Sequence, residues 1–151
     1  MGTQTQLTWY GHSAFKVVTP AGNVLMIDPW LTNPKNPNGQ RDLEKLERVD
    51  LILLSHGHSD HVGDAIEIAK QTGARLVTNF DLSTAMVAVL GYPEKQATAE
   101  TNGHVGGTIP LNDDVKVTIV PAFHGSFIQM EQSTAPIFAG PPTGLVIEIK
   151  N

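Results

Sequence analysis

The sequence predicts an α/β fold, because strand-like segments alternate with helix-like segments along the chain. Residues 51–55 have the composition of a buried strand, and a segment with helical spacing of apolar residues follows them. Residues 75–78 repeat this arrangement as the next strand before another helix. The 151 residues, 40% of them hydrophobic, match one ordinary domain and suffice for a packed core. We therefore expect a single α/β domain.

A β-meander is expected at the N-terminus. Residues 7–10, 14–19 and 24–28 are strand-like, and a turn containing proline and glycine separates the last two. The next segment, residues 30–40, is rich in proline and asparagine, which favours an irregular loop. Residues 41–48 have the charge and leucine spacing of a short helix. The first sheet is thus expected to begin with three consecutive strands.

A helix is expected over about residues 60–72. Its apolar spacing places Ala65, Ile66 and Ala69 on the inner face. Gly73 follows directly and is expected to stop the helix, since glycine readily adopts the left-handed conformation that ends helices. This helix would pack on the sheet through its small and branched side chains.

A further helix and two further strands complete the prediction. Asp81 or Ser83 can cap the helix, which is expected to end at Gly91. Residues 115–120 alternate in polarity as a strand does, and residues 145–149 are apolar and β-branched. The later part of the chain is therefore expected to add strands rather than helices.

The most informative segment is residues 56–61, which read His-Gly-His-Ser-Asp-His and directly follow an apolar run. Two histidines at positions i and i+2 of an extended loop can bind one metal ion, and Asp60 with His61 can begin a second site. Because the chain has no cysteine, any metal site must consist of imidazole and carboxylate ligands. Such ligands suit zinc, iron or manganese. We expect a metal-binding loop at the end of a strand.

Composition argues against several classes of partner. The formal net charge is −5, without a block of lysine or arginine, which counts against nucleic-acid binding. The sequence has no stretch near the roughly 20 apolar residues needed to cross a bilayer, so we expect no membrane partner. The first residues resemble no secretory signal, and we expect a cytoplasmic protein.

Three polar features at strand ends carry a resemblance to a known family. Asp28 follows one apolar strand, the motif at residues 56–61 follows the next, and His124 follows a third. In this respect the chain resembles the metallo-β-lactamase superfamily. Residues 7–15 and 140–144 are most similar to a bacterial group of metal-dependent hydrolases of uncertain substrate, whose relatives include lactonases and phosphodiesterases. The resemblance implies an αβ/βα sandwich, of which this chain would hold the N-terminal half and the start of the second half.

The resemblance implies two divalent metal ions, with zinc as the default and iron or manganese as alternatives. By position, His56, His58 and His124 would form the first site, while Asp60 and His61 would begin the second. A metal ion in such a site lowers the pKa of a bound water and polarises a carbonyl or phosphoryl oxygen. The implied reaction is therefore hydrolysis of a small-molecule ester, lactone or phosphodiester.

Five side chains receive individual expectations. Asp60 would orient the attacking water and accept its proton, and Asp28 would hydrogen-bond the histidine loop without touching a metal. His12 either bonds backbone in a turn or lines the site, and both interpretations stay open. His104 is expected to be a loop histidine, with a place at the border of the cleft as the alternative. Trp30 is an anchor of its loop or a wall of the cleft.

The chain departs from the family pattern at the second metal site. Members have a bridging aspartate and a last histidine in the second half, and neither occurs before Asn151. Asp113 and Asp114 lie in a turn before a strand, and no histidine follows His124. We expect the absent half to leave the inner face of the sheet open, and a second polypeptide to cover it. A homodimer through the same face and a simple truncation are the alternatives.

Three functions compete at this point. The leading interpretation is a metal-dependent hydrolase of a small molecule. A non-catalytic metal-binding module, or an incomplete hydrolase half that needs a complementing chain, is the second. An RNA-processing nuclease is the third, and the acidic balance of the chain counts against it.

Overall fold

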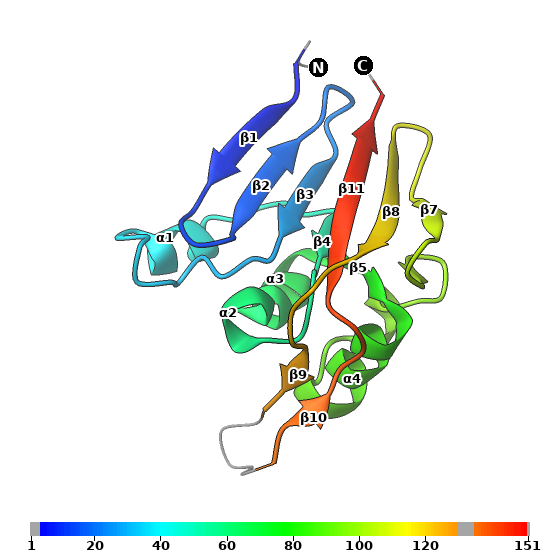
Figure 1. The fold of residues 1–151 in the computed structure, drawn as a ribbon. Helices are drawn as coiled ribbons and strands as arrows, with labels where there is room; N and C mark the ends of the chain where they lie inside the picture. The colour runs from blue at the N-terminus through cyan, green and yellow to red at the C-terminus, as the bar shows by residue number, and fades with distance from the viewer. Residues whose placement is uncertain (1–3, 130–134, 151) are drawn as a thin grey trace.

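The structure is a computed structural model, and it describes residues 4–129 and 135–150. Its first sheet has six strands in the order of the chain: β1 (Gln6–Trp9), β2 (Phe15–Val18), β3 (Val24–Ile27), β4 (Leu51–Leu53), β5 (Arg75–Asn79) and β6 (Asn102–Gly103). The strands β1, β2 and β3 pair antiparallel, whereas β3, β4, β5 and β6 pair parallel. Figure 1 shows this sheet and the turns that leave its lower edge.

A second sheet packs on one face of the first. Its strands, in the order β11, β8, β7, are Thr143–Ile149, Val115–Pro121 and Thr108–Pro110, all antiparallel to their neighbours. A two-stranded hairpin of β9 (Phe127–Ile128) and β10 (Ile137–Phe138) extends from the sandwich between β8 and β11 (Figure 1). His124 therefore lies in the connection that leads from β8 into this hairpin.

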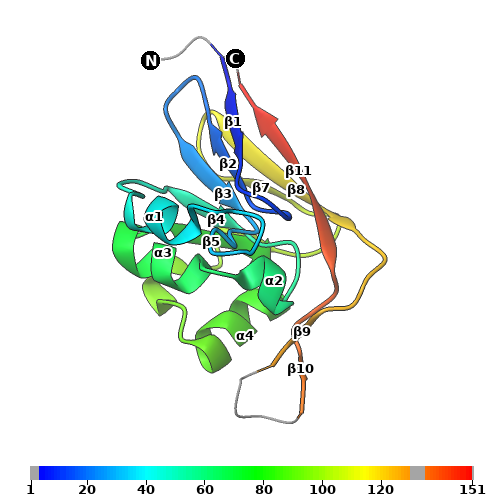
Figure 2. The same cartoon turned by 90° about the vertical axis from the view of Figure 1, so that its left-hand side faces the viewer.

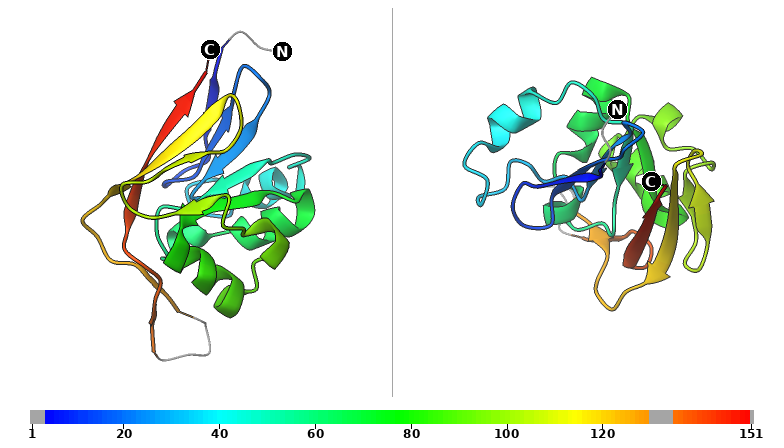
Figure 3. Two further views of the ribbon diagram at one scale, coloured as in Figure 1. Left: turned by 90° about the vertical axis from the view of Figure 1, so that its right-hand side faces the viewer. Right: turned by 90° about the horizontal axis from the view of Figure 1, so that it is seen from above.

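Helices cover the opposite face of the first sheet (Figure 2). They are α1 (Gly39–Glu44), α2 (Ser59–Val62), α3 (Ala65–Thr72), α4 (Phe80–Leu90) and the single 3₁₀ turn η1 (Glu94–Gln96). Two apolar cores result, one between the helices and the first sheet and one between the two sheets. Figure 3 shows the same three layers from two further directions.

The predicted α/β class is confirmed, and the strands expected at residues 7–10, 14–19, 24–28, 51–55, 75–78, 115–120 and 145–149 are all present within a few residues. Each has an apolar pattern strong enough to place it without tertiary context. The strands β6, β7, β9 and β10 were not predicted, because segments of two or three residues are too short to show a period.

The helix predicted over residues 60–72 is interrupted. Gly63 has a φ of 42°, which ends α2, and α3 begins at Ala65. Trp30 occupies the space in which a side chain at residue 63 would lie, since a Cβ there would be 2.5 Å from the Cα of Trp30. The side chain of Asp64 then accepts hydrogen bonds from the backbone N–H and hydroxyl of Thr32, at 2.9 and 2.8 Å. The contacts at this break thus hold the 30–40 loop against the helical layer.

Replacing Gly63 by alanine is expected to lower the free energy of unfolding by about 2 to 4 kcal/mol, because the new methyl group would overlap Trp30 and because a φ of 42° with a ψ of −121° is unfavourable for alanine. Gly73→Ala is the matched control, since Gly73 also has a positive φ, of 80°, but meets nothing within 4 Å. The control substitution should lower the free energy of unfolding by only about 1 kcal/mol. Urea denaturation of both variants measures the difference, and equal losses would contradict the role assigned to Trp30.

Smaller corrections concern helix ends and faces. The helix α1 begins at Gly39 and ends at Glu44, earlier than the predicted residues 41–48. The cap of α4 is Asn79, whose side chain accepts from the N–H of Leu82, and neither Asp81 nor Ser83 has this role. On α3, Ala65 and Ala69 are buried and Ile66 packs partly buried against the same core, as expected, and Ile68 is a further buried residue that was not predicted. Gly73 and Gly91 end α3 and α4 in the left-handed conformation, as predicted.

The inner face of the first sheet is less open than the sequence suggested. Strands β7, β8 and β11 of this chain cover β3, β4 and β5, so a packed core lies where an exposed apolar surface was expected. The uncovered part lies at β1, where Leu7 and Trp9 are 66% and 61% exposed. Leu7 pairs with Val17, which belongs to the core between the sheets, so these exposed side chains point to the same side. Among the described residues, β11 has β8 as its one neighbour in the second sheet.

Within residues 4–129 and 135–150, no helix is both long and apolar enough to span a membrane. The cytoplasmic location expected from the sequence stays a prediction.

Candidate metal centre

The polar residues singled out in the sequence meet at the ends of strands. Asp28 follows β3 and His56 follows β4 closely, and the two strands are parallel neighbours, so their carboxyl ends share one edge of the sheet. His124 follows β8 of the second sheet. The centre therefore lies where the two sheets of the sandwich meet, and residues distant in sequence contribute to it.

The first group consists of His56, His58 and His124, whose candidate ligand nitrogens all lie within 4.8 Å of one another. Nε2 of His56 and Nδ1 of His58 are 3.1 Å apart. The ring of His124 lies 4.8 Å from that of His56 and 5.1 Å from that of His58, centroid to centroid. His56 is buried and His124 is exposed, so this group leads from the interior to the surface.

The second group consists of His12, Asp60 and His61, with the same 4.8 Å limit between candidate ligand atoms. Asp60 and His61 lie on α2, and His12 lies in the turn between β1 and β2. His61 links the two groups, because its ring centroid is 4.0 Å from that of His56. The two groups are thus adjacent, as two ions in one binuclear site would be.

Asp28 is connected by hydrogen bonds to both groups, directly to His61 and through Ser55 to His56. Its carboxylate accepts from the backbone N–H of Ser55 at 2.8 Å, lies 2.6 Å from the Ser55 hydroxyl, and lies 2.8 Å from Nδ1 of His61. The side chain is buried, and its backbone has a φ of 41°, which is uncommon outside glycine. Because Nδ1 of His61 faces Asp28, Nε2 is the nitrogen left to bind a ligand.

Burial and neighbouring charges shift the ionisation of the centre. Burial lowers the pKa of His56 to about 4, and the positive charge that His61 can carry adds to the effect. Burial also lowers the pKa of His58, aided by His124. Burial alone would lower the pKa of His61, but the hydrogen bond and charge of Asp28 outweigh it and raise that pKa. The buried histidine of the first group is therefore neutral and ready to act as a ligand.

The remaining predicted residues lie at different distances from this cluster. Trp30 is half-buried, and its ring edge meets the ring of His12 at a centroid distance of 5.7 Å. His104 is exposed after β6 and contacts the ring of Phe80, and it belongs to neither group of candidate ligands among the described residues. Trp30 thus borders the centre, whereas His104 lies apart from both groups.

Sequence reasoning missed several residues of the centre. Ser55 joins Asp28 to His56, since its hydroxyl is 2.9 Å from Nδ1 of His56. The position of Ser55 directly before the histidine motif is the sequence feature that could have indicated this role. Phe127 packs against His58 with ring centroids 4.5 Å apart, and it comes from the hairpin strand β9. No local sequence pattern predicts that contact, because it depends on how β8 leads into the hairpin.

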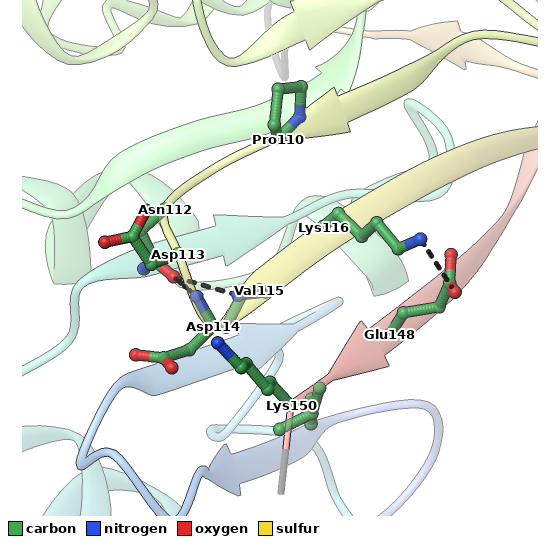
Figure 4. A pocket seen from close by; sticks show the side chains of 9 residues that line it. Pro110, Asn112, Asp113, Asp114, Val115, Lys116, Glu148 and Lys150 are labelled. Carbon is green, nitrogen blue, oxygen red and sulfur yellow. Dashed lines mark hydrogen bonds and ion pairs between the residues drawn. The ribbon is translucent and has the colours of Figure 1, made fainter.

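A pocket of about 380 Å³ lies away from the histidines, beside the start of β8 and the end of β11 (Figure 4). Lys116 and Glu148 on its wall form an ion pair of 3.0 Å, and the side chain of Asn112 caps the turn before β8. Asp113 and Asp114, the acidic residues considered as substitutes for the second-site ligands, lie here and not at the centre. The residues that line this pocket belong to neither of the two groups of candidate ligands.

The residues of the centre fit a divalent metal ion. On a tetrahedral zinc with ligands at 2.0–2.1 Å, the ligand atoms are about 3.4 Å apart, close to the spacing of the His56 and His58 nitrogens. Among the described residues, Nε2 of His58 is buried without a hydrogen-bond partner. An unpaired buried polar group costs about 1–3 kcal/mol, and a ligand bound at this nitrogen, such as a metal ion, would satisfy it. The contact between His56 and His58 is of hydrogen-bond length, and the same imidazole nitrogens are placed so that they could also bind a metal ion.

The chain is similar to known metal-dependent hydrolases. A model of the beta-lactamase superfamily domain matches residues 23–151. A UPF0173 metal-dependent hydrolase of Thermodesulfovibrio yellowstonii is 55% identical over 149 residues, covering 97% of this chain and 56% of that protein. A solved metallo hydrolase from the archaeon Ignicoccus hospitalis is similar at 31% identity and a TM-score of 0.76, covering 97% of this chain and 57% of that one.

A class B3 di-zinc metallo-beta-lactamase from an Alaskan soil metagenome has the same fold, with a TM-score of 0.57 at 18% identity, covering 97% of this chain and 60% of that one. This chain therefore spans little more than half the length of each of the three proteins.

Proposed function

Since this chain belongs to the beta-lactamase superfamily, we propose that it carries the metal centre of a hydrolase that acts on a small-molecule ester, lactone or phosphodiester. The observation that supports this most directly is the adjacency of two groups of three candidate ligands. Bound divalent ions, with zinc as the default, would lower the pKa of water and polarise the scissile group. The donor set of imidazole and carboxylate also suits iron or manganese.

The chain's own residues have separate roles in this proposal. His56, His58 and His124 hold the first ion, and Asp60 with His61 holds the second. The Asp60 carboxylate is 43% exposed, so it can reach an incoming water and take its proton.

Asp28 fixes the orientation of the ring of His61 through the 2.8 Å contact to Nδ1. The pKa of Asp60 is lowered, because the charge of His61 and a backbone hydrogen bond outweigh the opposing effect of burial. Asp60 is therefore ionised near neutral pH, the state that a proton acceptor needs.

The proposal includes a partner for the part of the fold that this chain does not contain. The chain covers just over half of the relatives' length, and Leu7 and Trp9 remain exposed beside the inter-sheet core. A complementing polypeptide would cover them and add strands beside β11, and a second copy of the chain is the alternative. Native mass spectrometry of the purified protein distinguishes a complex with another polypeptide, a dimer and a monomer by mass.

Hydrolysis that depends on metal is the expected result of a direct assay. The purified chain is treated with chelator, dialysed, and supplied with zinc, iron or manganese before incubation with a generic ester, a lactone and bis-p-nitrophenyl phosphate. At least one probe should be hydrolysed, the rate should fall to background in chelator, and an added metal should restore it. Metal uptake without hydrolysis of any probe would instead favour the alternative of a metal-binding half that needs its complement for activity.

Acidification is expected to release the second ion before the first. A histidine must be neutral to bind a metal, so a raised pKa means that protons compete with the metal at a higher pH. The pKa of His61 is raised by Asp28, whereas that of His56 is lowered to about 4. As the pH falls, the chain should therefore pass from two bound ions to one, and then to none. Metal content after dialysis at a series of pH values measures this order, and simultaneous loss of both ions would contradict it.

A further inference from the structure

His12 has a position that the proposed roles above leave unexplained. It lies between β1 and β2, far from the histidine motif in sequence, yet its Nε2 is 3.1 Å from Oδ2 of Asp60. Its ring also meets the ring of His61 edge-on, with centroids 5.2 Å apart. We propose that His12 is a ligand of the second metal ion, together with Asp60 and His61. The inference rests on the proposed metal centre and names a ligand that the motif does not contain.

The three candidate ligand atoms converge on one point. Nε2 of His61 approaches Oδ2 of Asp60 at 3.9 Å, and Nε2 of His12 approaches the same oxygen at 3.1 Å. Ligand atoms on one tetrahedral ion are about 3.4 Å apart, so small rotations of these side chains would complete the coordination. The side chains of His12 and Asp60 are 33% and 43% exposed, which leaves them room to adjust.

Electrostatics favours a cation at this point. An ionised carboxylate only accepts hydrogen bonds, and a neutral imidazole has a lone pair on one of its two nitrogens. Nδ1 of His61 already faces Asp28, so its Nε2 lone pair points towards the region of Asp60. Lone pairs that converge repel one another unless a proton or a metal ion lies between them. A divalent ion satisfies all three at once, whereas a single proton bridges only two.

The surrounding backbone holds His12 in an unusual conformation. Its φ is 48°, which is uncommon for a residue other than glycine and costs about 1–3 kcal/mol. The indole N–H of Trp9 donates to the carbonyl oxygen of His12 at 3.0 Å. The backbone at Gly11 also lies close to the 30–40 loop, since a Cβ at this position would be 2.7 Å from Oδ1 of Asn33. This rigid turn keeps the imidazole directed at Asp60.

The competing interpretation is that His12 only hydrogen-bonds Asp60. His12→Asn removes the Nε2 contact to Asp60 while keeping a residue that tolerates a positive φ but is a poor zinc ligand. Loss of a merely supporting hydrogen bond lowers metal affinity about 10- to 100-fold, so the size of the loss separates the two roles. His104→Asn is the matched control, since His104 lies in neither candidate group. Both variants are exchanged into chelator, dialysed and titrated with zinc, and bound ions are counted by native mass spectrometry.

The wild-type chain and His104→Asn should each bind two zinc ions, and His12→Asn should retain the first while binding the second at least about 100-fold more weakly. Two ions bound by His12→Asn with wild-type affinity would overturn the assignment of His12. A wild-type chain that takes up one ion, unaffected by the substitution, would also overturn it but leave a single-metal hydrolase standing. A wild-type chain that binds no zinc would refute the proposed function itself.

A second readout needs no variant. In the ¹⁵N-labelled wild-type chain, the Nε2 resonance of His12 should move with the second equivalent of zinc and stay in place during the first. A His12 resonance that does not respond to either equivalent would overturn the proposal even if His12→Asn failed to fold.

Discussion

His58→Ala is expected to remove the first metal ion and to reduce any metal-dependent hydrolysis to background. Loss of residues that merely support a ligand already lowers metal affinity about 10- to 100-fold, so loss of a ligand should cost more than about 100-fold. The ring of His58 lies 4.6 Å from that of His56 and 5.1 Å from that of His124, centroid to centroid. No other histidine of the described residues is close enough to replace it without leaving the second group. Zinc content by mass spectrometry and hydrolysis of the most reactive probe are measured together.

The control for this substitution is His104→Ala. Both changes delete one imidazole, but His104 is exposed and lies outside the centre. It should keep both ions and the full rate. The fold of His58→Ala should persist, because His58 is partly buried and precedes α2 without capping it through its side chain. A variant at position 58 that retains the wild-type zinc content would contradict the first group as a metal site.

Asp28→Asn is expected to lower both the stability of the metal-free chain and the affinity for the second ion. The buried carboxylate accepts from the Ser55 backbone and contacts the Ser55 hydroxyl and His61, and an amide cannot accept at both positions. Hydrogen bonds to charged groups contribute about 1.5–3 kcal/mol each, so a loss of about 2–4 kcal/mol is expected. Because asparagine tolerates a positive φ, backbone strain at position 28 would not explain the result.

Asp50→Asn is the matched control. Asp50 also accepts a backbone N–H, that of Val24 at 2.7 Å, but it precedes β4 and lies at the opposite end of that strand from the histidines. Its substitution should cost about 1 kcal/mol and leave zinc binding unchanged. Urea denaturation in chelator measures stability, and zinc titration measures affinity about 10- to 100-fold lower in Asp28→Asn. Equal zinc affinities in the two variants would show that Asp28 does not orient His61.

Much of the fold was predictable from local patterns. The strand β4 and the motif after it form a contiguous signal, because an apolar run and four candidate metal ligands lie side by side in the sequence. The ends of α3 and α4 were likewise predictable, since Gly73 and Gly91 have the conformation that helix ends require. The contacts of Asp28 could be expected from its place after a strand parallel to β4, together with the resemblance to a known family.

Other parts depend on tertiary contacts that no local pattern reveals. The break at Gly63 exists because Trp30, from a loop far away in sequence, needs that space. The convergence of His12 on Asp60 depends on how the β1–β2 turn meets α2. The covered inner face was misjudged because a three-stranded sheet needs β7, which has only three residues and no visible period. Local sequence could therefore identify the candidate ligands within the motif, the resemblance added His124 to the first group, and neither established His12 as a member of the second.

The division of the first group between layers has a consequence for assembly. His56 and His58 follow a strand of one sheet, and His124 follows a strand of the other, so an ion bound to all three would link the two sheets of the sandwich. The unfolded chain would have to close the long loop between these residues to bind the ion in the same way, and loop closure opposes this entropically. Metal uptake would then report that the two sheets have docked, and zinc would slow their separation.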